Sequence, residues 1–148
     1  LYMKTQVFFI GRGTDCAVSY EGSLKLKEIS YINSFAVAAG ELKHGTIALV
    51  EQDTLVVALA TQGKLFEKMI SNIQEVKARG AYVVAVAQES CKQLEGHADR
   101  VIHIPDCRDE FTPILAVIPL QLFSYHVARF RGCDIDKPKN LAKSVTVE

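Results

Sequence analysis

The sequence has no excess of charge of either sign, because Lys and Arg together number 17 and Asp and Glu also number 17. A domain that binds nucleic acid usually has a basic excess or a basic stripe, and this sequence has neither. No apolar run approaches the roughly 20 residues that a membrane-spanning helix needs, and the first residues lack the layout of a signal peptide. These absences argue against a nucleic-acid-binding or membrane-spanning protein.

The four cysteines are too scattered for a metal or redox motif. Cys16, Cys91, Cys107 and Cys133 form no CxxC pair, and zinc sites and dithiol motifs need closer spacing. We therefore expect reduced thiols in a cytoplasmic protein, with no metal site.

The length of 148 residues fits one domain. The chain shows no internal repeat, low-complexity tract or linker, and only the segment from Asp134 onward is a polar tail. The first residue is not Met, so we expect a piece of a longer protein.

Short apolar runs alternate with helical patterns along the chain. Runs that are apolar on both faces are typical of a parallel sheet covered by helices on each side. The expected strands are residues 7–10, 34–39, 54–60, 81–87 and 101–104, and the expected helices are 14–33, 64–79 and 113–131. The sequence therefore predicts an α/β fold, a three-layer sandwich with a mostly parallel sheet.

The first predicted helix carries its charges on an unexpected face. At about 100° per residue, Glu21, Lys25 and Glu28 share an arc with the large apolar residues Leu24 and Tyr31. One interpretation is a surface pair between Glu21 and Lys25, with Glu28 in water at the edge of the core. The other is that this face lines a partly buried cleft, where a carboxylate with a raised pKa could transfer protons near neutral pH.

Two further residues have an ordinary and a functional interpretation. His44 lies among polar residues and glycines, which is usual for a surface histidine, but imidazole is also suited to acid–base chemistry at neutral pH. Lys143 in the tail is ordinarily a solubility group, and it could form a Schiff base only if the tail folds over a cleft. We expect the other histidines, His97, His103 and His126, to be structural.

Two long motifs resemble a known family. Residues 21–45, EGSLKLKEISYINSFAVAAGELKHG, and residues 136–148, DKPKNLAKSVTVE, are similar to the isomerase part of glutamine–fructose-6-phosphate aminotransferases. Residues 71–80 and 119–128 also fit, so the similarity covers essentially the whole chain. The resemblance implies a SIS (sugar isomerase) fold over residues 1–148, the second of two copies in the synthase half, with the tail 134–148 included.

The resemblance also implies roles for individual residues. Glu28 would move a proton between C1 and C2 of the sugar, and Lys143 would form a Schiff base with the C2 carbonyl of fructose-6-phosphate. His44 would help to open the sugar ring in the site of a neighbouring subunit, which implies a homodimer. No cofactor is implied, because the Lys and Glu groups suffice for enolisation. The residues implied to support or touch the substrate are Lys25, Glu21 and Ala142.

Two parts of the family's machinery are missing. The phosphate-binding loop, a Ser/Thr-rich turn, belongs to the first SIS copy, and residues 61–64 here have one hydroxyl and one glycine, which we interpret as a vestigial site. The glutaminase domain that releases ammonia is also absent. Because the phosphate loop is missing and His44 must come from a second subunit, we expect the chain alone to fold but to be inactive in making glucosamine-6-phosphate.

Two alternatives stay open. An amino-sugar phosphate deaminase or deglycase with SIS domains would lack the glutaminase domain, and such relatives generally lack the full NLAKSVTVE ending. A non-catalytic SIS module that senses sugar phosphates would have no need for Glu28, His44 and Lys143 together.

Overall fold

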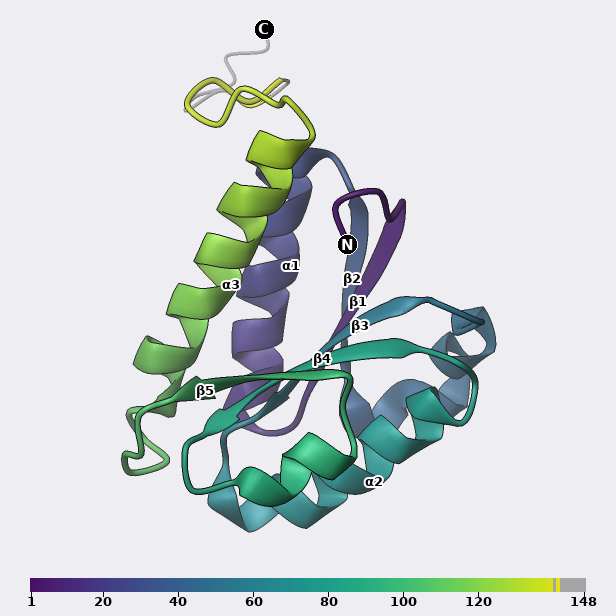
Figure 1. Ribbon diagram of the computed structural model, residues 1–148, viewed down its shortest axis with the longest axis vertical. Coiled ribbons are helices and arrows are strands. Elements are labelled where there is room, and N and C mark those ends of the chain that lie inside the picture. Colours follow the sequence, from purple (N-terminus) through teal and green to yellow (C-terminus); the bar gives the residue numbers. More distant parts are fainter. Residues whose placement is uncertain (140, 142–148) are drawn as a thin grey trace, which may run out of the picture.

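Five parallel strands form one sheet in the computed structural model, which describes residues 1–139 and 141 (Figure 1). The order across the sheet is β2-β1-β3-β4-β5. All five predicted strands are present, and the predicted α/β sandwich is confirmed. The strands are β1 (Gln6–Gly11), β2 (Asn33–Ala38), β3 (Leu55–Ala60), β4 (Tyr82–Gln88) and β5 (Arg100–Ile104).

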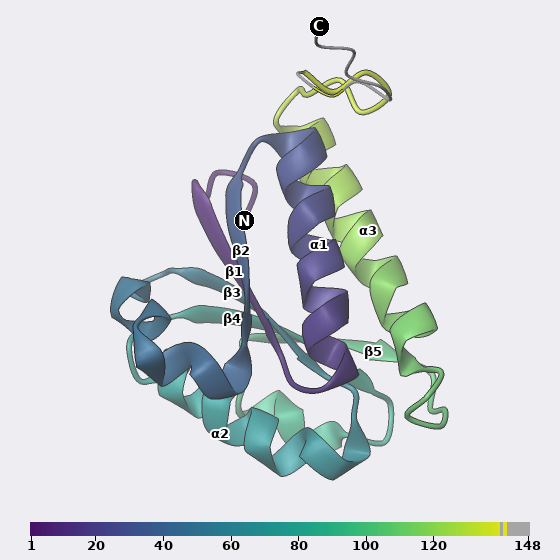
Figure 2. The same ribbon diagram turned by 180° about the vertical axis from the view of Figure 1, so that it is seen from behind.

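Helices cover both faces of the sheet. Helices α1 (Thr14–Ser30) and α3 (Thr112–Phe130) lie side by side on one face, and α2 (Phe66–Lys77) lies on the other, as both ribbon views show (Figures 1 and 2). No helix within residues 1–139 combines the length and apolar content needed to cross a membrane. The short 3₁₀ helices are η1 (Ala39–His44), η2 (Thr46–Leu49), η3 (Gly63–Leu65) and η4 (Lys92–Gly96).

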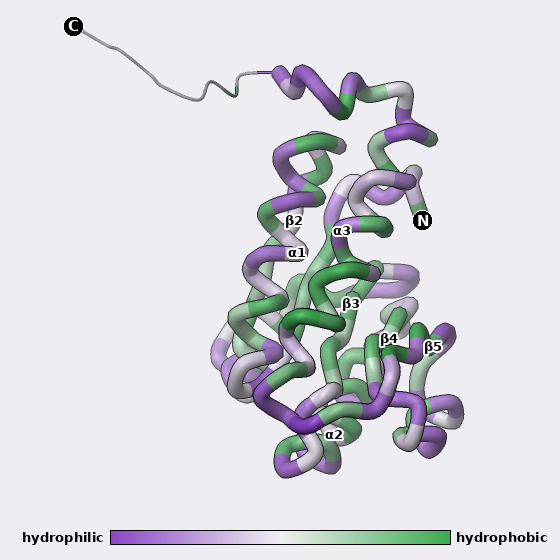
Figure 3. The backbone as a smooth tube through the Cα atoms, turned by 90° about the vertical axis from the view of Figure 1, so that its left-hand side faces the viewer, coloured by the Kyte–Doolittle hydropathy of each residue, from purple (hydrophilic) through white to green (hydrophobic). Residues whose placement is uncertain are grey.

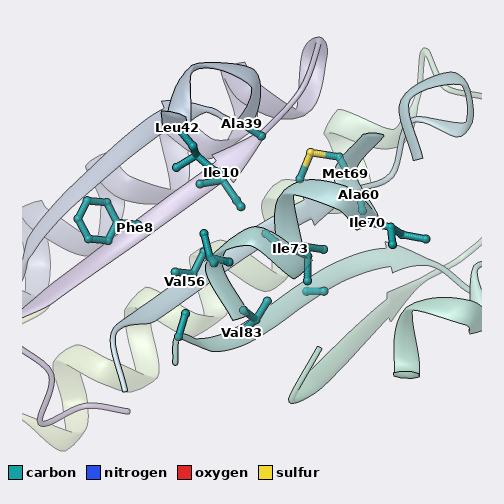
Figure 4. Close-up of a cluster of buried hydrophobic side chains, with 14 of the residues drawn as sticks. Phe8, Ile10, Ala39, Leu42, Val56, Ala60, Met69, Ile70, Ile73 and Val83 are labelled. Carbon is teal, nitrogen blue, oxygen red and sulfur yellow. The ribbon is translucent and has the colours of Figure 1, made fainter. Parts of the chain in front are cut away.

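The sheet separates two hydrophobic cores because successive strand residues point to opposite faces. Val7 and Phe9 of β1 pack on the side of α1 and α3, whereas Phe8 and Ile10 pack on the side of α2. Figure 4 shows the second core, where Met69 and other α2 side chains meet the strands. Apolar residues are concentrated in the strands and in much of α3, and polar residues in the loops (Figure 3).

The buried face of α1 is not the face that carries Leu24 and Tyr31. Leu24 and Tyr31 are exposed, and the buried face consists mainly of small residues such as Gly22 and Ser23. A Cβ added to Gly22 would lie 2.7 Å from a methyl carbon of Leu120 in α3, so only small side chains allow this close packing. The polar and apolar residues that α1 buries are Asp15, Val18, Ser19, Gly22, Ser23, Leu26 and Ser30.

Serine is tolerated on this buried face because its hydroxyl finds partners within reach. Ser19 and Ser30 donate to the backbone carbonyls of Asp15 and Leu26, at 2.8 and 2.6 Å. Ser23 donates to the hydroxyl of Ser34 in β2. The arc that carries Glu21, Lys25 and Glu28 therefore points away from the core.

Candidate active site

Three charged side chains follow one another on the outward face of α1. Lys25 lies between Glu21 and Glu28, and its Nζ is 2.6 Å from Glu28 Oε2 and 3.8 Å from Glu21 Oε1. The hydrogen bond to Glu28 is the main reason why the pKa of Lys25 is raised. The predicted pair between Glu21 and Lys25 is thus present, and the contact of Lys25 with Glu28 is the closer of the two. An ion pair as exposed as this one contributes at most about 1 kcal/mol to stability, so its main effect is to fix the Glu28 carboxylate.

Glu28 lines a shallow pocket between α1 and the segment after α3. The pocket has a volume of about 360 Å³, and the Glu28 side chain is 27% exposed. A carboxylate that is both fixed and open to a pocket can accept a proton from a bound molecule. Of the three charged residues for which a cleft was considered, Glu28 lines this shallow pocket and Glu21 and Lys25 do not. The residues that line the pocket are Leu24, Lys27, Glu28, Tyr31, Lys139 and Leu141.

His44 lies at the far end of the molecule from Glu28. It ends η1, which follows the carboxyl end of β2, beside the place where β1 leads into α1. Glu28 is 14 positions along α1 from Thr14, which corresponds to about 21 Å along the helix axis. Figure 2 shows η1 at the lower end of α1, next to α2, and the last turn of α1 at the upper end. One chain therefore does not bring His44 and Glu28 together.

The η1 segment holds His44 outward. Leu42 is fully buried in the core beside Ile10 (Figure 4), and Lys43 Nζ is 2.9 Å from Glu75 Oε1 in α2. The His44 side chain is 74% exposed, and its Nε2 is 3.9 Å from Glu41 Oε2. An imidazole on a firmly anchored segment and directed into solvent is available to a second molecule.

The loop at the carboxyl end of β3 is occupied by the protein's own carboxylates. The Thr61 backbone N–H and hydroxyl donate to Asp15, at 2.7 and 2.5 Å, and the Gly63 N–H donates to Asp109 Oδ1 at 3.1 Å. Asp15 is fully buried, and burial raises its pKa although the hydrogen bonds from Thr61 oppose this. These two amides therefore already have acceptors within the protein.

Sequence reasoning missed Asp15. Asp15 lies in the first turn of the helix after β1, and its pairing with Thr61 depends on β1 and β3 being neighbours, which the structure shows and the sequence did not predict. Of the remaining histidines, His103 contacts Glu95 and the Gln88 carbonyl, and His97 contacts Gln74. Lys143 and Ala142 lie outside the described residues.

The SIS domain family model matches residues 1–130. The chain belongs to the SIS domain family.

This SIS domain is similar to one part of much longer proteins. It is 67% identical over 147 residues to the glutamine–fructose-6-phosphate aminotransferase (isomerizing) of Caldanaerobacter subterraneus subsp. tengcongensis and 58% identical to that of Clostridium tetani. In both cases the match covers 99% of this chain and 24% of the relative. The chain thus spans about a quarter of the length of the curated relatives it matches.

Two solved structures extend this comparison. The C-terminal domain of glucosamine-fructose-6-phosphate aminotransferase from Francisella tularensis matches with a TM-score of 0.87 and 41% identity, over 93% of this chain and 39% of that one. Glucosamine-6-phosphate deaminase from Thermotoga maritima matches with a TM-score of 0.78 and 30% identity, over 97% and 41%. The family resemblance that the two sequence motifs indicated is confirmed.

Proposed function

We propose that this chain is the second of two SIS segments in the synthase half of a glutamine–fructose-6-phosphate aminotransferase. The complete enzyme would convert fructose-6-phosphate and ammonia released from glutamine into glucosamine-6-phosphate. The observation that carries the proposal is the Glu28 carboxylate, fixed by Lys25 at 2.6 Å and facing a pocket that the segment after α3 helps to form. The high identity to aminotransferases of this name supports it.

In the proposed chemistry, Lys143 is the nucleophile and Glu28 is the acid–base group. The Lys143 amine adds to the C2 carbonyl of open-chain fructose-6-phosphate and water leaves, which gives a Schiff base. Ammonia then displaces the Lys143 amine from C2, which frees the lysine and leaves the imine of the sugar phosphate, and Glu28 transfers a proton from C1 to C2 of that imine to give glucosamine-6-phosphate. Lys25 would stabilise the negative charge on Glu28, Glu21 would support the site through its ion pair with Lys25, and the backbone near Ala142 would contact the sugar.

The course of the tail supports this assignment. Lys139 lies at the Glu28 end of α1, where its N–H donates to the Tyr31 hydroxyl. This end of the described chain is therefore the Glu28 end of the molecule and not the His44 end, which agrees with the proposed pairing of Glu28 with the tail.

The distance between His44 and Glu28 supports a homodimer. The two residues lie at opposite ends of α1, so a site that uses both must take His44 from a second subunit. We propose that His44 of one chain assists ring opening at the Glu28 site of its partner.

The hydrogen bonds of the loop at residues 61–63 support the proposal that the two SIS segments contribute different parts of the site. Its amides already donate to Asp15 and Asp109, so the phosphate anchor would come from the first segment. We therefore expect the 148-residue chain to bind fructose-6-phosphate poorly and to be inactive.

The test compares the full-length protein with its Lys143→Ala variant. We expect glutamine-dependent formation of glucosamine-6-phosphate by the first and loss of it in the second. Calorimetry on the 148-residue chain should detect no tight binding of fructose-6-phosphate. Synthesis that persists in Lys143→Ala would contradict the Schiff-base assignment, and tight binding by the short chain would contradict the proposed phosphate anchor.

A second candidate is a glucosamine-6-phosphate deaminase, because the Thermotoga maritima structure of that name shares the fold at 30% identity. The same assay separates the two functions. A full-length protein that releases ammonia from glucosamine-6-phosphate and ignores glutamine would favour the deaminase.

A further inference from the structure

Helix α3 carries large apolar side chains on the face that points away from the core. Ile114, Ile118 and Leu122 are 64, 48 and 53% exposed, and they follow one another at intervals of four residues, which places them on one side of the helix. Phe111 and Tyr125 extend this row by about one turn at each end and are exposed as well. We call these five residues the outer face of α3.

The composition of α3 is that of a helix with no face in water. Arg129 is the only Asp, Glu, Lys or Arg among residues 112–130, whereas the shorter α2 has four such residues in 12 (Figure 3). Helices that are apolar all round are normally buried on all sides. Within the described residues, α3 packs on its inner side against α1 and the sheet, and its outer face stays exposed. The outer face is therefore expected to be covered in a complete protein.

A groove continues the outer face onto the edge of the sheet. It has a volume of about 380 Å³, and its lining includes Ile102 and Ile104 of β5 and Ile118 and Leu122 of α3. In the described part of the chain, β5 has a neighbouring strand only on the side of β4. Because Ile118 and Leu122 belong to both, the outer face and the groove form one continuous apolar surface.

The first residues of the chain lie against the last turns of α3. The Tyr2 ring stacks on the Phe130 ring with 5.6 Å between their centres, and Arg131 Nη1 donates to the Tyr2 carbonyl at 2.9 Å. Leu1 and Tyr2 line a second apolar hollow of about 280 Å³, together with Val127 and Phe130 of α3.

The hollow and the groove open on the same side of α3. Pro119 lines the groove and His126 lines the hollow, seven positions later, which is almost two full turns of the helix. In the proposed full-length protein, the residues that precede Leu1 therefore reach this domain beside the groove.

We propose that the outer face of α3 and the adjoining groove are the surface on which the first SIS segment of the full-length protein packs. This inference rests on the proposed function, which makes this chain the second of two SIS segments. The chain spans 39% of the Francisella tularensis C-terminal domain, so more than half of that domain lies outside the match. A partner in the same chain is held at a high effective concentration, which favours it over a second copy. Its docking face must be apolar too, because the outer face of α3 offers no charge to pair with.

Hydroxyl-radical footprinting of the full-length protein measures whether the outer face is covered. Leu122 and Leu49 are the same residue type and are 53 and 58% exposed, so without a cover they would be oxidised at similar rates. The core of an interface is packed as tightly as a protein interior, so we expect Leu122 to be oxidised about fivefold more slowly than Leu49. Equal rates would overturn the proposal.

Leu122→Glu in the full-length protein then identifies the occupant, with Leu49→Glu as the matched control. A carboxylate without a partner opposes burial, so hydrogen exchange in the first SIS segment should accelerate by about tenfold in Leu122→Glu and stay at the wild-type rate in Leu49→Glu. Leu122→Ala should act in the same direction by a smaller factor, and it replaces Leu122→Glu if that variant does not fold.

Two other outcomes are distinct. A Leu122→Glu protein that sediments as a smaller oligomer, with wild-type exchange in the first segment, would overturn the proposal in favour of a second copy as the occupant. A wild type that makes no glucosamine-6-phosphate from glutamine would overturn the proposed function. Because footprinting and exchange need no substrate, they still decide whether the segment before Leu1 packs on α3.

Discussion

Helix α1 has one carboxylate near each end, and the two differ in their surroundings. Asp15, in the first turn, is fully buried and receives both hydrogen bonds from Thr61 of the neighbouring loop. Glu28, in the last turns, is paired with Lys25 and faces a pocket. An acid whose lone pairs are satisfied by its own fold stabilises structure, whereas an acid that is held but open can exchange protons with a ligand.

The first test of this comparison removes the charge of Glu28. Glu28→Gln in the full-length protein should lower kcat by about 10²- to 10⁴-fold, the usual contribution of a general acid–base group. Its thermal stability should stay near that of the wild type, because the side chain is partly exposed. The exposed Glu67→Gln is the matched control. A Glu28→Gln protein with near-normal turnover would remove Glu28 from the chemistry.

The second test removes the buried acid. Asp15→Ala leaves the Thr61 N–H and hydroxyl without their acceptor, and the free energy of unfolding should fall by about 3 kcal/mol. Urea unfolding of the chain measures this, with the exposed Asp136→Ala as control. A loss no larger than that of the control would mean that Asp15 does not hold the loop.

A third test sharpens the comparison through pH. Because burial raises the pKa of Asp15 in the folded state, the unfolded chain releases this proton first as pH rises. The stability contributed by protonated Asp15 is complete below the ordinary pKa and is lost as pH rises through the raised one. The free energy of unfolding of the wild type should therefore fall, relative to that of Asp15→Asn, as the pH rises from the ordinary pKa of Asp15 to its raised pKa.

The control for this pH series is Asp53→Asn. Asp53 is exposed and has φ 62°, a conformation that asparagine also adopts readily. A wild-type stability that rises relative to Asp15→Asn over the same interval would contradict the burial argument.

The fold was predictable because strand and helix periods differ strongly in this sequence. Runs such as 54–60 are apolar on both faces, and only a sheet covered on both sides buries them completely. The helix end was less predictable. Helix α1 ends at Ser30 and not near residue 33, since Tyr31 adopts a left-handed conformation that no local signal announced.

The orientation of α1 could not be predicted from its large apolar residues. The helix packs so closely on α3 that Gly22 and the serines face inward, and Leu24 faces outward. The arc that holds Leu24, Glu28 and Tyr31 does line a pocket, on the outward side of the helix. The pairing of Asp15 with Thr61 depends on which strands are neighbours, and strand order is a long-range property that local patterns do not contain.

The central claim is that an active site combines Glu28 of one subunit with His44 of another. The most direct test mixes two inactive full-length variants, Glu28→Gln and His44→Ala, after dissociation and reassembly. Random pairing makes half of the dimers mixed, and each mixed dimer has one intact site of two, so we expect about a quarter of wild-type activity. Each variant reassembled alone should stay inactive. A mixture that stays as inactive as its components would contradict a shared site and return both residues to a single chain.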